Sequence, residues 1–295
     1  MPPQINLPHL RQWLGRSEQR SDLVTAMPLA ALSATLDRDD PLPAPGSDVP
    51  PLWHWLYFTP LARQSQIGAD GHALRGGFLP PVPLPRRMWA GGRLEFHDPL
   101  RVGDEVTRSS RIVSVDGKAG RSGALVFVTV RHELSNPRGL ALSEEHDIVY
   151  RDVPAPNAAP DASSAPVVKP QPAPSDETFK REIVPDAVLL FRYSALTFNG
   201  HRIHYDRAYV TEVEGYPGLI VHGPLIATLL LDLLRREMPQ VRVRRFSFTA
   251  LRPLFDIHRF TLCGRHEVAD DKRSAMLWAR NHEGQLAMQA QAELG

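Results

Sequence analysis

Histidine and amide side chains are concentrated in one short segment of the second half of the chain, residues 191–206 (FRYSALTFNGHRIHYD). It contains Asn199, His201 and His204 within six positions. A neutral imidazole is suited to general acid–base catalysis because its unperturbed pKa lies close to neutrality. The Asn199-Gly200 pair is a turn signal, so the segment should break there and continue into a short helix that carries His204. These residues predict a site at which His204 moves protons.

The sequence His222-Gly223-Pro224 follows, directly before the most apolar run of the chain. Proline is tolerated in the first turn of a helix, where its N–H would have no partner. The run from Pro224 to Arg236 is apolar on nearly every face, which is typical of a buried helix. The Gly223 N–H would then lie at the positive end of this helix. Backbone donors there stabilise a carbonyl oxygen that gains negative charge.

Other interpretations of these residues stay open. His201 and His204 could be a metal-binding pair, but no carboxylate or cysteine stands at ligand spacing, so we expect no metal. His201 could instead be a structural hydrogen-bonding residue, and Asn199-Gly200 an ordinary turn. The single cysteine, Cys263, lies in a strand-like run and is interpreted as a small buried apolar residue.

The composition argues against several classes of protein. Lys and Arg together number 34 and Asp and Glu 33, so the charge balance gives no sign of a nucleic-acid or anionic-membrane partner. The longest apolar run, residues 225–234, is too short to span a bilayer. The N-terminus lacks the uninterrupted apolar stretch of a secretory signal, and one cysteine fits a reducing compartment. We therefore expect a soluble, cytoplasmic protein.

A segment rich in Pro, Ala and Ser, residues 152–178, divides the chain into two halves. Such a stretch cannot bury a core and should be an extended, solvated linker. The N-terminal half (1–151) and the C-terminal half (179–295) each carry Pro-Leu, followed by Thr at one spacing, at 99–107 and 253–261. This similarity and the matching order of elements indicate a duplicated fold.

Each half is predicted to contain a helix followed by antiparallel strands. Turns are expected at Asp116-Gly117 and at residues 282–284. A buried helix wrapped by an antiparallel sheet is the hot-dog arrangement, so the predicted fold class is α+β, a double hot dog with one long central helix in each repeat. The predicted elements are a helix over 28–36 and strands over 93–96, 105–115, 123–134 and 142–151, then a helix over 224–236 and strands over 241–249, 259–268, 274–280 and 285–293.

Residues 197–206 (TFNGHRIHYD) resemble the motif of the MaoC-like (R)-specific enoyl-CoA hydratases: Ser-Gly-Asp, one residue, Asn-Pro, an aliphatic residue and His. The wording is closer still to one branch, the mesaconyl-C4-CoA (3-methylfumaryl-CoA) hydratases and the hydroxyacyl-thioester dehydratases. Residues 76–92 (GGFLPPVPLPRRMWAGG) also resemble this branch, as does the His-Gly pair before the long helix. On this chain the motif's Ser, catalytic Asp, Asn and catalytic His positions are Thr197, Asn199, His201 and His204.

The resemblance implies a hydro-lyase that adds water reversibly to an α,β-unsaturated dicarboxylic acyl-CoA, with 3-methylfumaryl-CoA giving (S)-citramalyl-CoA as the preferred reaction. In the wider family an Asp and a His share the attacking water, but Asn199 cannot take a proton. We therefore expect His204 to be the general base and Asn199 to orient the water, with the proton returned through His204 or His201. The Gly223 N–H would hold the thioester oxygen. No cofactor beyond the CoA of the substrate is expected, and family analogy implies a homodimer.

Residues that contact the substrate are expected around this segment and on the following strands. Arg192 could bind a substrate carboxylate or be a surface arginine. Arg245, like three other arginines between residues 242 and 252, could reach CoA phosphates or lie on a solvated strand face. The first half has no copy of the His204 segment and should shape the acyl pocket. The predicted substrate-binding set is Arg192, Thr197, Tyr205, His222 and Arg245.

Other functions are compatible with the same residues. An itaconyl-CoA hydratase or a 3-hydroxyacyl-thioester dehydratase would use the same groups. The hot-dog fold also occurs in thioesterases and in acyl-CoA-binding proteins that catalyse nothing. A thioesterase would need a carboxylate to drive hydrolysis, and residues 191–206 offer only Asp206, which we expect to face away from the site.

Overall fold

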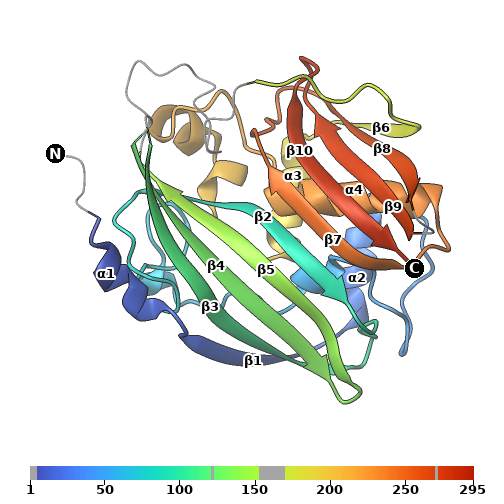
Figure 1. Cartoon of the computed structure of the whole chain (residues 1–295), viewed down its shortest axis with the longest axis horizontal. Helices are drawn as coiled ribbons and strands as arrows, with labels where there is room; N and C mark the ends of the chain where they lie inside the picture. Colours follow the sequence, from blue (N-terminus) through green and yellow to red (C-terminus); the bar gives the residue numbers. More distant parts are fainter. Residues whose placement is uncertain (1–4, 121–122, 153–169, 270–271) are drawn as a thin grey trace.

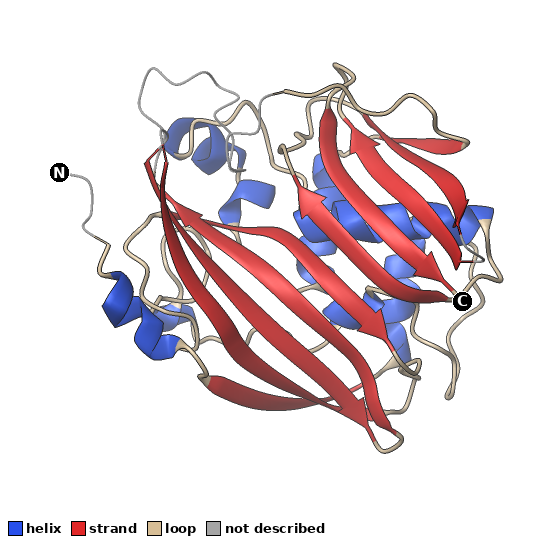
Figure 2. Ribbon diagram, in the orientation of Figure 1, coloured by secondary structure: helices blue, strands red, loops and turns tan. Residues whose placement is uncertain are grey.

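Ten strands form one antiparallel sheet (Figures 1 and 2). The computed structural model describes residues 5–120, 123–152, 170–269 and 272–295. The strand order is β1-β3-β4-β5-β2-β7-β10-β9-β8-β6, so the strands of each half stay together. The strands are β1 (Ser17–Leu23), β2 (Arg86–Phe96), β3 (Glu105–Gly120), β4 (Gly123–Asn136), β5 (Gly139–Arg151), β6 (Phe179–Ile183), β7 (Val243–Ala250), β8 (Phe260–Ala269), β9 (Lys272–Arg280) and β10 (Leu286–Leu294).

The helices of the described residues are mostly short, and three of them lie together behind the C-terminal strands in the view of Figure 1. They are α2 (Ala26–Thr35), α3 (Ala187–Leu196) and α4 (Gly223–Glu237), while α1 (Leu7–Leu10) lies beside the N-terminal strands. The shorter helical segments are η1 (Arg11–Trp13), η2 (Trp53–Leu56), η3 (Gln64–Gln66), η4 (Arg202–His204) and η5 (Tyr209–Val213). None of the described helices is long and apolar enough to cross a bilayer.

Helix α4 is the centre of the C-terminal half. Every residue from Leu225 to Leu234 is buried, which confirms the prediction of a buried helix. Each fully buried leucine contributes about 1.5–3 kcal/mol through the hydrophobic effect. The one carboxylate in this stretch, Asp232, is 3% exposed and is hydrogen-bonded by Arg38 (2.7 Å), Arg181 (3.0 Å) and Arg236 (2.8 Å). A buried charge is tolerated where it is paired in this way.

The two halves are joined by pairing between β2 and β7. Gly91 lies opposite Thr249 and Gly92 opposite Phe248. A Cβ atom on Gly91 would lie 2.6 Å from the carbonyl oxygen of Phe248, and one on Gly92 would lie 2.9 Å from its ring. Glycine is therefore needed at both positions for the strands to approach, and the continuous sheet brings residues of both halves to one site.

All eight predicted strands are present, most with ends within a few residues of the prediction, but β2 begins at Arg86, seven residues before the predicted start. The strands β1 and β6, which were not predicted, stand at the two edges of the sheet and carry mostly polar and charged residues. Charged edge strands discourage pairing with other chains, and they lack the apolar alternation that identifies a strand. The turn predicted at Asp116-Gly117 was wrong, because these residues continue β3 and pair with Phe127 and Val126 of β4.

The predicted linker is described only in part, since residues 153–169 lie outside the described residues. Its described end is hydrogen-bonded to the C-terminal half rather than solvated along its length. Leu286 N–H donates to the carbonyl of Gln171 (3.0 Å), and Ala173 N–H donates to that of Gly284 (3.0 Å). Gly284 belongs to the turn between β9 and β10, which lies where the sequence predicted it.

Candidate active site

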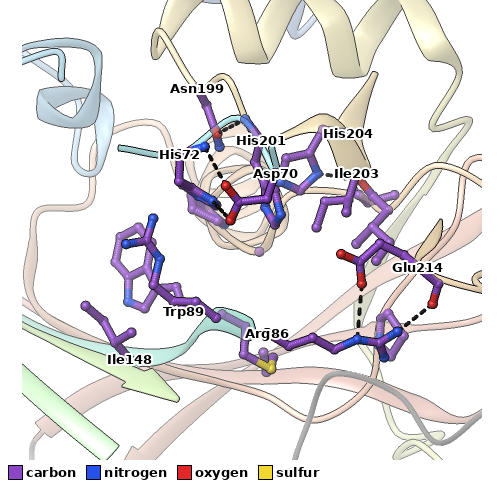
Figure 3. A pocket seen from close by; sticks show the side chains of 18 of the residues that line it. Asp70, His72, Arg86, Trp89, Ile148, Asn199, His201, Ile203, His204 and Glu214 are labelled. Carbon is purple, nitrogen blue, oxygen red and sulfur yellow. Dashed lines mark hydrogen bonds and ion pairs between the residues drawn. The ribbon is translucent and has the colours of Figure 1, made fainter. Parts of the chain in front are cut away.

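A cavity of about 380 Å³ lies between the two halves, and residues from both line it (Figure 3). The C-terminal half contributes all four predicted catalytic residues: Asn199, His201, His204 and Gly223. The N-terminal half contributes residues that the sequence did not single out for chemistry, chiefly Asp70, His72, Arg86, Arg87, Trp89 and His146.

The imidazole of His204 is held as a neutral base. Its side chain is on η4, it is 7% exposed, and Nδ1 lies 2.7 Å from the carbonyl oxygen of Ile220. A carbonyl oxygen only accepts, so Nδ1 carries the proton and Nε2 keeps its lone pair. Burial lowers the pKa of His204 to about 4, although the bond to Ile220 opposes this shift. Near neutral pH the ring is therefore uncharged and able to accept a proton.

The turn that presents His204 is built by local hydrogen bonds. Helix α3 ends at Leu196, and Phe198 takes a left-handed backbone conformation (φ 49°) that reverses the chain. Asn199 then donates its N–H to the carbonyl of Ser194 (2.8 Å), and its side-chain oxygen accepts the N–H of His201 (3.0 Å). The amide oxygen of Asn199 thus accepts one hydrogen bond within this turn, and its NH₂ group can donate to a molecule in the cavity.

His222 lies behind His204 and does not line the cavity. It is fully buried, its ring stacks on His204 at 3.6 Å between centroids, and its Nε2 lies 2.8 Å from Ser194 Oγ. Burial, followed by the neighbouring His204, lowers the pKa of His222 well below its usual value. His222 was predicted to bind substrate, but in the structure it packs against the face of the His204 ring that is turned away from the cavity.

Gly223 begins helix α4, and Pro224 follows it. The first amides of an α-helix have no partner within the helix, and they carry the positive end of its dipole. Gly223 lines the cavity, at the amide end of this helix. Its role as a donor to a substrate oxygen stays a prediction.

Four predicted substrate-binding residues are not among the residues that line the cavity. Arg192 is exposed on α3. Thr197 Oγ donates to the carbonyl of Tyr193 (2.8 Å), and the Tyr205 hydroxyl donates to that of Gly200 (3.0 Å), so both close local turns. Arg245 is exposed on β7 and pairs with Glu95 (3.0 Å) and Glu293 (3.4 Å). Thr197 and Tyr205 are bonded to backbone carbonyls close by in the chain, and Arg245 is paired with carboxylates on the neighbouring strands β2 and β10.

The loop that carries Asp70 and His72 docks directly on the His204 segment. A Cβ atom on Gly71 (φ 89°) would lie 1.8 Å from the carbonyl oxygen of Gly200, so only glycine fits. Arg202 N–H donates to the carbonyl of Asp70 (2.9 Å). Within the loop, Asp70 Oδ2 lies 3.1 Å from His72 Nδ1, and Oδ1 accepts the His72 N–H at 3.0 Å. The Asp-Gly-His sequence was the available signal, but nothing in it indicates this partner.

Three imidazoles line this side of the cavity. The ring centroids of His72 and His201 are 4.1 Å apart, and those of His201 and His204 are 5.5 Å apart. Burial, and then the mutual repulsion of the rings, lowers the pKa of His201 well below its usual value, and burial also lowers the pKa of His72. Burial would raise the pKa of Asp70, but its hydrogen bonds from His72 outweigh this and lower it to about 2. The cluster is thus a carboxylate with neutral imidazoles.

Two groups of described residues have the composition of metal sites. The ligand atoms of Asp70, His72 and His201 all lie within 4.8 Å of one another, as do those of His132, Glu144 and His146. The expectation of no metal was based on the absence of a carboxylate near His201, and the fold supplies one from the other half of the chain. Such a group binds a cation where its lone pairs converge, and otherwise holds and transfers protons.

Two neighbouring arginines of β2 line the cavity in different states. Arg86 Nε lies 3.1 Å from Glu214 Oε2, and its guanidinium stacks over the ring of Tyr216 at 4.9 Å. Arg87 forms no ion pair with a carboxylate of the described residues, although its charge lowers the pKa of His201 and of Asp70. Arg252, one of the four arginines considered for CoA, also lines the cavity.

The chain is similar to a family of known enzymes. The family model for hydroxyacyl-thioester dehydratase type 2 matches residues 52–256. The mesaconyl-C(4)-CoA hydratase of Chloroflexus aurantiacus is 47% identical, over 96% of this chain and 97% of that protein. The mitochondrial hydroxyacyl-thioester dehydratase type 2 of Schizosaccharomyces pombe is 26% identical, over 82% of this chain and 88% of that protein.

Solved structures show the same fold. A MaoC-like dehydratase superposes with a TM-score of 0.73 at 16% identity, covering 97% of this chain and 99% of that one. A Mycobacterium tuberculosis protein described as a double hot dog superposes with a TM-score of 0.58 at 14% identity, covering 96% of both chains. These likenesses confirm the predicted double hot-dog fold. The protein belongs to the hydroxyacyl-thioester dehydratase type 2 family.

Proposed function

We propose that the protein is a hydro-lyase that adds water reversibly to 3-methylfumaryl-CoA, giving (S)-citramalyl-CoA. The observation that carries the proposal is the presence in one cavity of a neutral imidazole, His204, and of Gly223, the first residue of helix α4. Base and oxyanion donor are the groups that hydration of a conjugated thioester requires. The similarity to a named mesaconyl-C(4)-CoA hydratase supports this choice of substrate.

In the forward direction, His204 Nε2 takes a proton from water while the water oxygen bonds to the β-carbon. The electron pair of the double bond moves onto the thioester oxygen, where the Gly223 N–H stabilises the developing negative charge. The pair then returns to the α-carbon, which takes up a proton, and the thioester carbonyl is restored. Asn199 contributes its NH₂ group as a donor to the water oxygen, consistent with the orienting role expected from the sequence.

Arg87 supports a substrate with a second carboxylate. It is a cation in the cavity without a carboxylate partner among the described residues, next to an arginine that Glu214 already neutralises. A guanidinium binds a carboxylate through two parallel hydrogen bonds. Replacing Arg87 with Met should lower kcat/KM for 3-methylfumaryl-CoA by about 10–100-fold, the loss of a charge-assisted hydrogen bond. The matched control is Arg192→Met, a surface arginine outside the cavity, which should change little.

The deciding experiment measures the hydration rates of 3-methylfumaryl-, itaconyl-, fumaryl- and crotonyl-CoA by chromatographic separation of substrate and product thioesters. We expect 3-methylfumaryl-CoA to be hydrated fastest, with a clear preference over crotonyl-CoA. Equal turnover of crotonyl-CoA would contradict the dicarboxylate preference and favour a 3-hydroxyacyl-thioester dehydratase. A faster reaction with itaconyl-CoA would identify the rival hydratase, and release of free CoA would identify a thioesterase.

A further inference from the structure

We propose that Asp70 and His72, both from the N-terminal half, are the second acid–base group of the active site: a carboxylate-backed imidazole that holds the proton between its removal from water and its delivery to the α-carbon. The inference rests on the proposed hydration. It assigns a catalytic role to the half of the chain that was expected only to shape the acyl pocket.

Few carboxylates near the cavity could balance the charge of a protonated imidazole. Of the described residues that line the cavity, Asp70 and Glu214 are the acidic ones. Glu214 is occupied by Arg86 at 3.1 Å. Asp206, in the His204 segment, is paired with Arg202 at 2.8 Å and does not line the cavity, and Asn199 is an amide. Asp70 is therefore the carboxylate placed to balance a positive charge that appears on an imidazole during the reaction.

The hydrogen bonds between Asp70 and His72 make His72 the more stable site for a proton. Asp70 holds His72 by two bonds, one to the backbone N–H and one to Nδ1. A carboxylate on Nδ1 fixes that tautomer, so Nε2 has the free lone pair, and it stabilises the imidazolium that forms when Nε2 takes a proton. His204 has only the neutral carbonyl of Ile220 at its Nδ1. Of the two imidazoles, His72 is thus the one better able to keep a proton.

His72 and His204 lie close enough to belong to one group of histidines, with His201 between them. Figure 3 shows His72 and His204 on either side of His201, all facing the same cavity. The Gly71–Gly200 backbone contact and the bond from Arg202 N–H to the Asp70 carbonyl fix the loop against the His204 segment. The two halves therefore hold the three imidazoles as one rigid group, which is the condition for efficient proton transfer.

In this proposal the proton that leaves the water is the one that the α-carbon receives. Water loses a proton to His204 Nε2 as its oxygen bonds to the β-carbon. His204 becomes neutral again as the proton passes through the imidazole cluster to His72 Nε2, and the Asp70 carboxylate balances the charge on His72. The imidazolium N–H bond breaks as the enolate electron pair forms the new α-carbon–hydrogen bond. His72 ends neutral, as it began, and one water has been added without any other reactant.

The test uses Asp70→Asn, which keeps the size of the side chain and an acceptor for the His72 N–H. We expect kcat for 3-methylfumaryl-CoA to fall by about 10²–10⁴-fold while KM stays within about twofold. His72→Gln should give a loss of similar size. The matched control is Asp206→Asn, the same change on the segment that docks against this loop, which should keep activity close to that of the wild type.

The pH profile separates a catalytic from a structural role. His72 is faced by Asp70, Arg87, Arg75 and His201, and Asp70 is the one group among them whose charge favours protonation of the ring. Asp70→Asn should therefore shift the acidic limb of the kcat profile to lower pH. A loss of activity with an unshifted limb, or an activity within about threefold of the wild type, would overturn the proposal.

Three outcomes remain distinguishable from one another. If chelation removes wild-type activity and a metal is present in the wild type but lost in Asp70→Asn, the cluster is a metal site and the proposal is wrong. If the wild type hydrates none of the four thioesters, the proposed function fails, and the proton relay with it. If the wild type is active and Asp70→Asn is equally active, only the relay fails.

Discussion

The protein contains two clusters that combine a carboxylate with histidines, and they differ in what surrounds the carboxylate. Glu144 is 3% exposed, and its oxygens contact His54 Nε2 (3.1 Å), Trp55 Nε1 (3.0 Å) and His146 Nε2 (3.0 Å). Asp70 lies on a loop with its side chain 31% exposed and borders the cavity. We call these the closed cluster (His54, His132, Glu144, His146) and the open cluster (Asp70, His72, His201, His204).

The comparison shows that residue types alone do not distinguish a catalytic cluster from a structural one. Burial would raise the pKa of Glu144, but the neighbouring His146 and His54 outweigh it and lower the pKa well below its usual value. A buried carboxylate whose acceptor sites are occupied by fixed donors holds its surroundings rigid. Glu144 does not line the cavity, although its partner His146 does, whereas Asp70 lines it together with His72. A carboxylate that lies at the cavity can stabilise a charge that appears there during a reaction.

The largest expected effect is on stability, in the closed cluster. Glu144→Ala leaves the ring nitrogens of His54 and Trp55 without their partner, removes the charge beside His146, and should lower the free energy of unfolding by about 3–5 kcal/mol. Asp70→Ala, in the open cluster, should cost only about 1 kcal/mol, because water can replace its partners. Urea unfolding followed by circular dichroism measures both. Equal losses would mean that the two clusters are equally structural.

The next effect concerns the oxyanion donor, which accompanies only the open cluster. Gly223→Pro removes the N–H at a helix position that accepts proline, and His222 before it already has the extended backbone that a proline requires (φ −59°, ψ 129°). We expect kcat to fall by about 10²–10³-fold. Gly223→Ala keeps the N–H, and its Cβ would meet only the Trp89 carbonyl oxygen at 3.8 Å, so it serves as control. Comparable rates for the two variants would exclude this amide from the reaction.

The smallest effect compares the pH dependence of stability in the two clusters. Burial lowers the pKa of His204 to about 4 and that of His132 to about 3. The unfolded state, with a histidine pKa near 6.5, then binds more protons than the folded state as the pH falls below 6.5. Each histidine should therefore remove about 2 kcal/mol of stability between pH 7 and pH 5. Below pH 4 the loss from His204 levels off, while that from His132 continues.

Substitution with Gln should remove each of these contributions. Urea midpoints measured from pH 7 to pH 3 for the wild type, His204→Gln and His132→Gln give the comparison. A His204→Gln variant that loses stability with falling pH as steeply as the wild type would show that this ring is not held neutral.

Much of the fold could be predicted because strand and helix signals are local. The run of β-branched residues in β4 predicts a strand, and the apolar run in α4 predicts a buried helix. The edge strands β1 and β6 could not be identified, because solvated edges carry no apolar alternation. Asp116-Gly117 was misleading, since β3 extends past it in the pairing with β4.

Only the part of the site that the C-terminal half contributes could be predicted from the sequence. Asn199, His201, His204 and Gly223 stand close together along the chain or beside a helix start, and all four line the cavity. Asp70 and His72 are more than 120 residues away in sequence, and a backbone contact between two glycines brings them in. Arg245 was chosen for its charge, which two surface carboxylates already satisfy.

The most direct test of the account measures the hydration rate of 3-methylfumaryl-CoA for two matched variants, His204→Gln in the open cluster and His54→Gln in the closed cluster. Folding of both is checked first by circular dichroism. The account predicts that His204→Gln loses at least about 10²-fold in kcat, while folded His54→Gln keeps a rate close to that of the wild type. A His204→Gln variant as fast as the wild type, or an equal loss in both variants, would contradict the assignment of the chemistry to the open cluster.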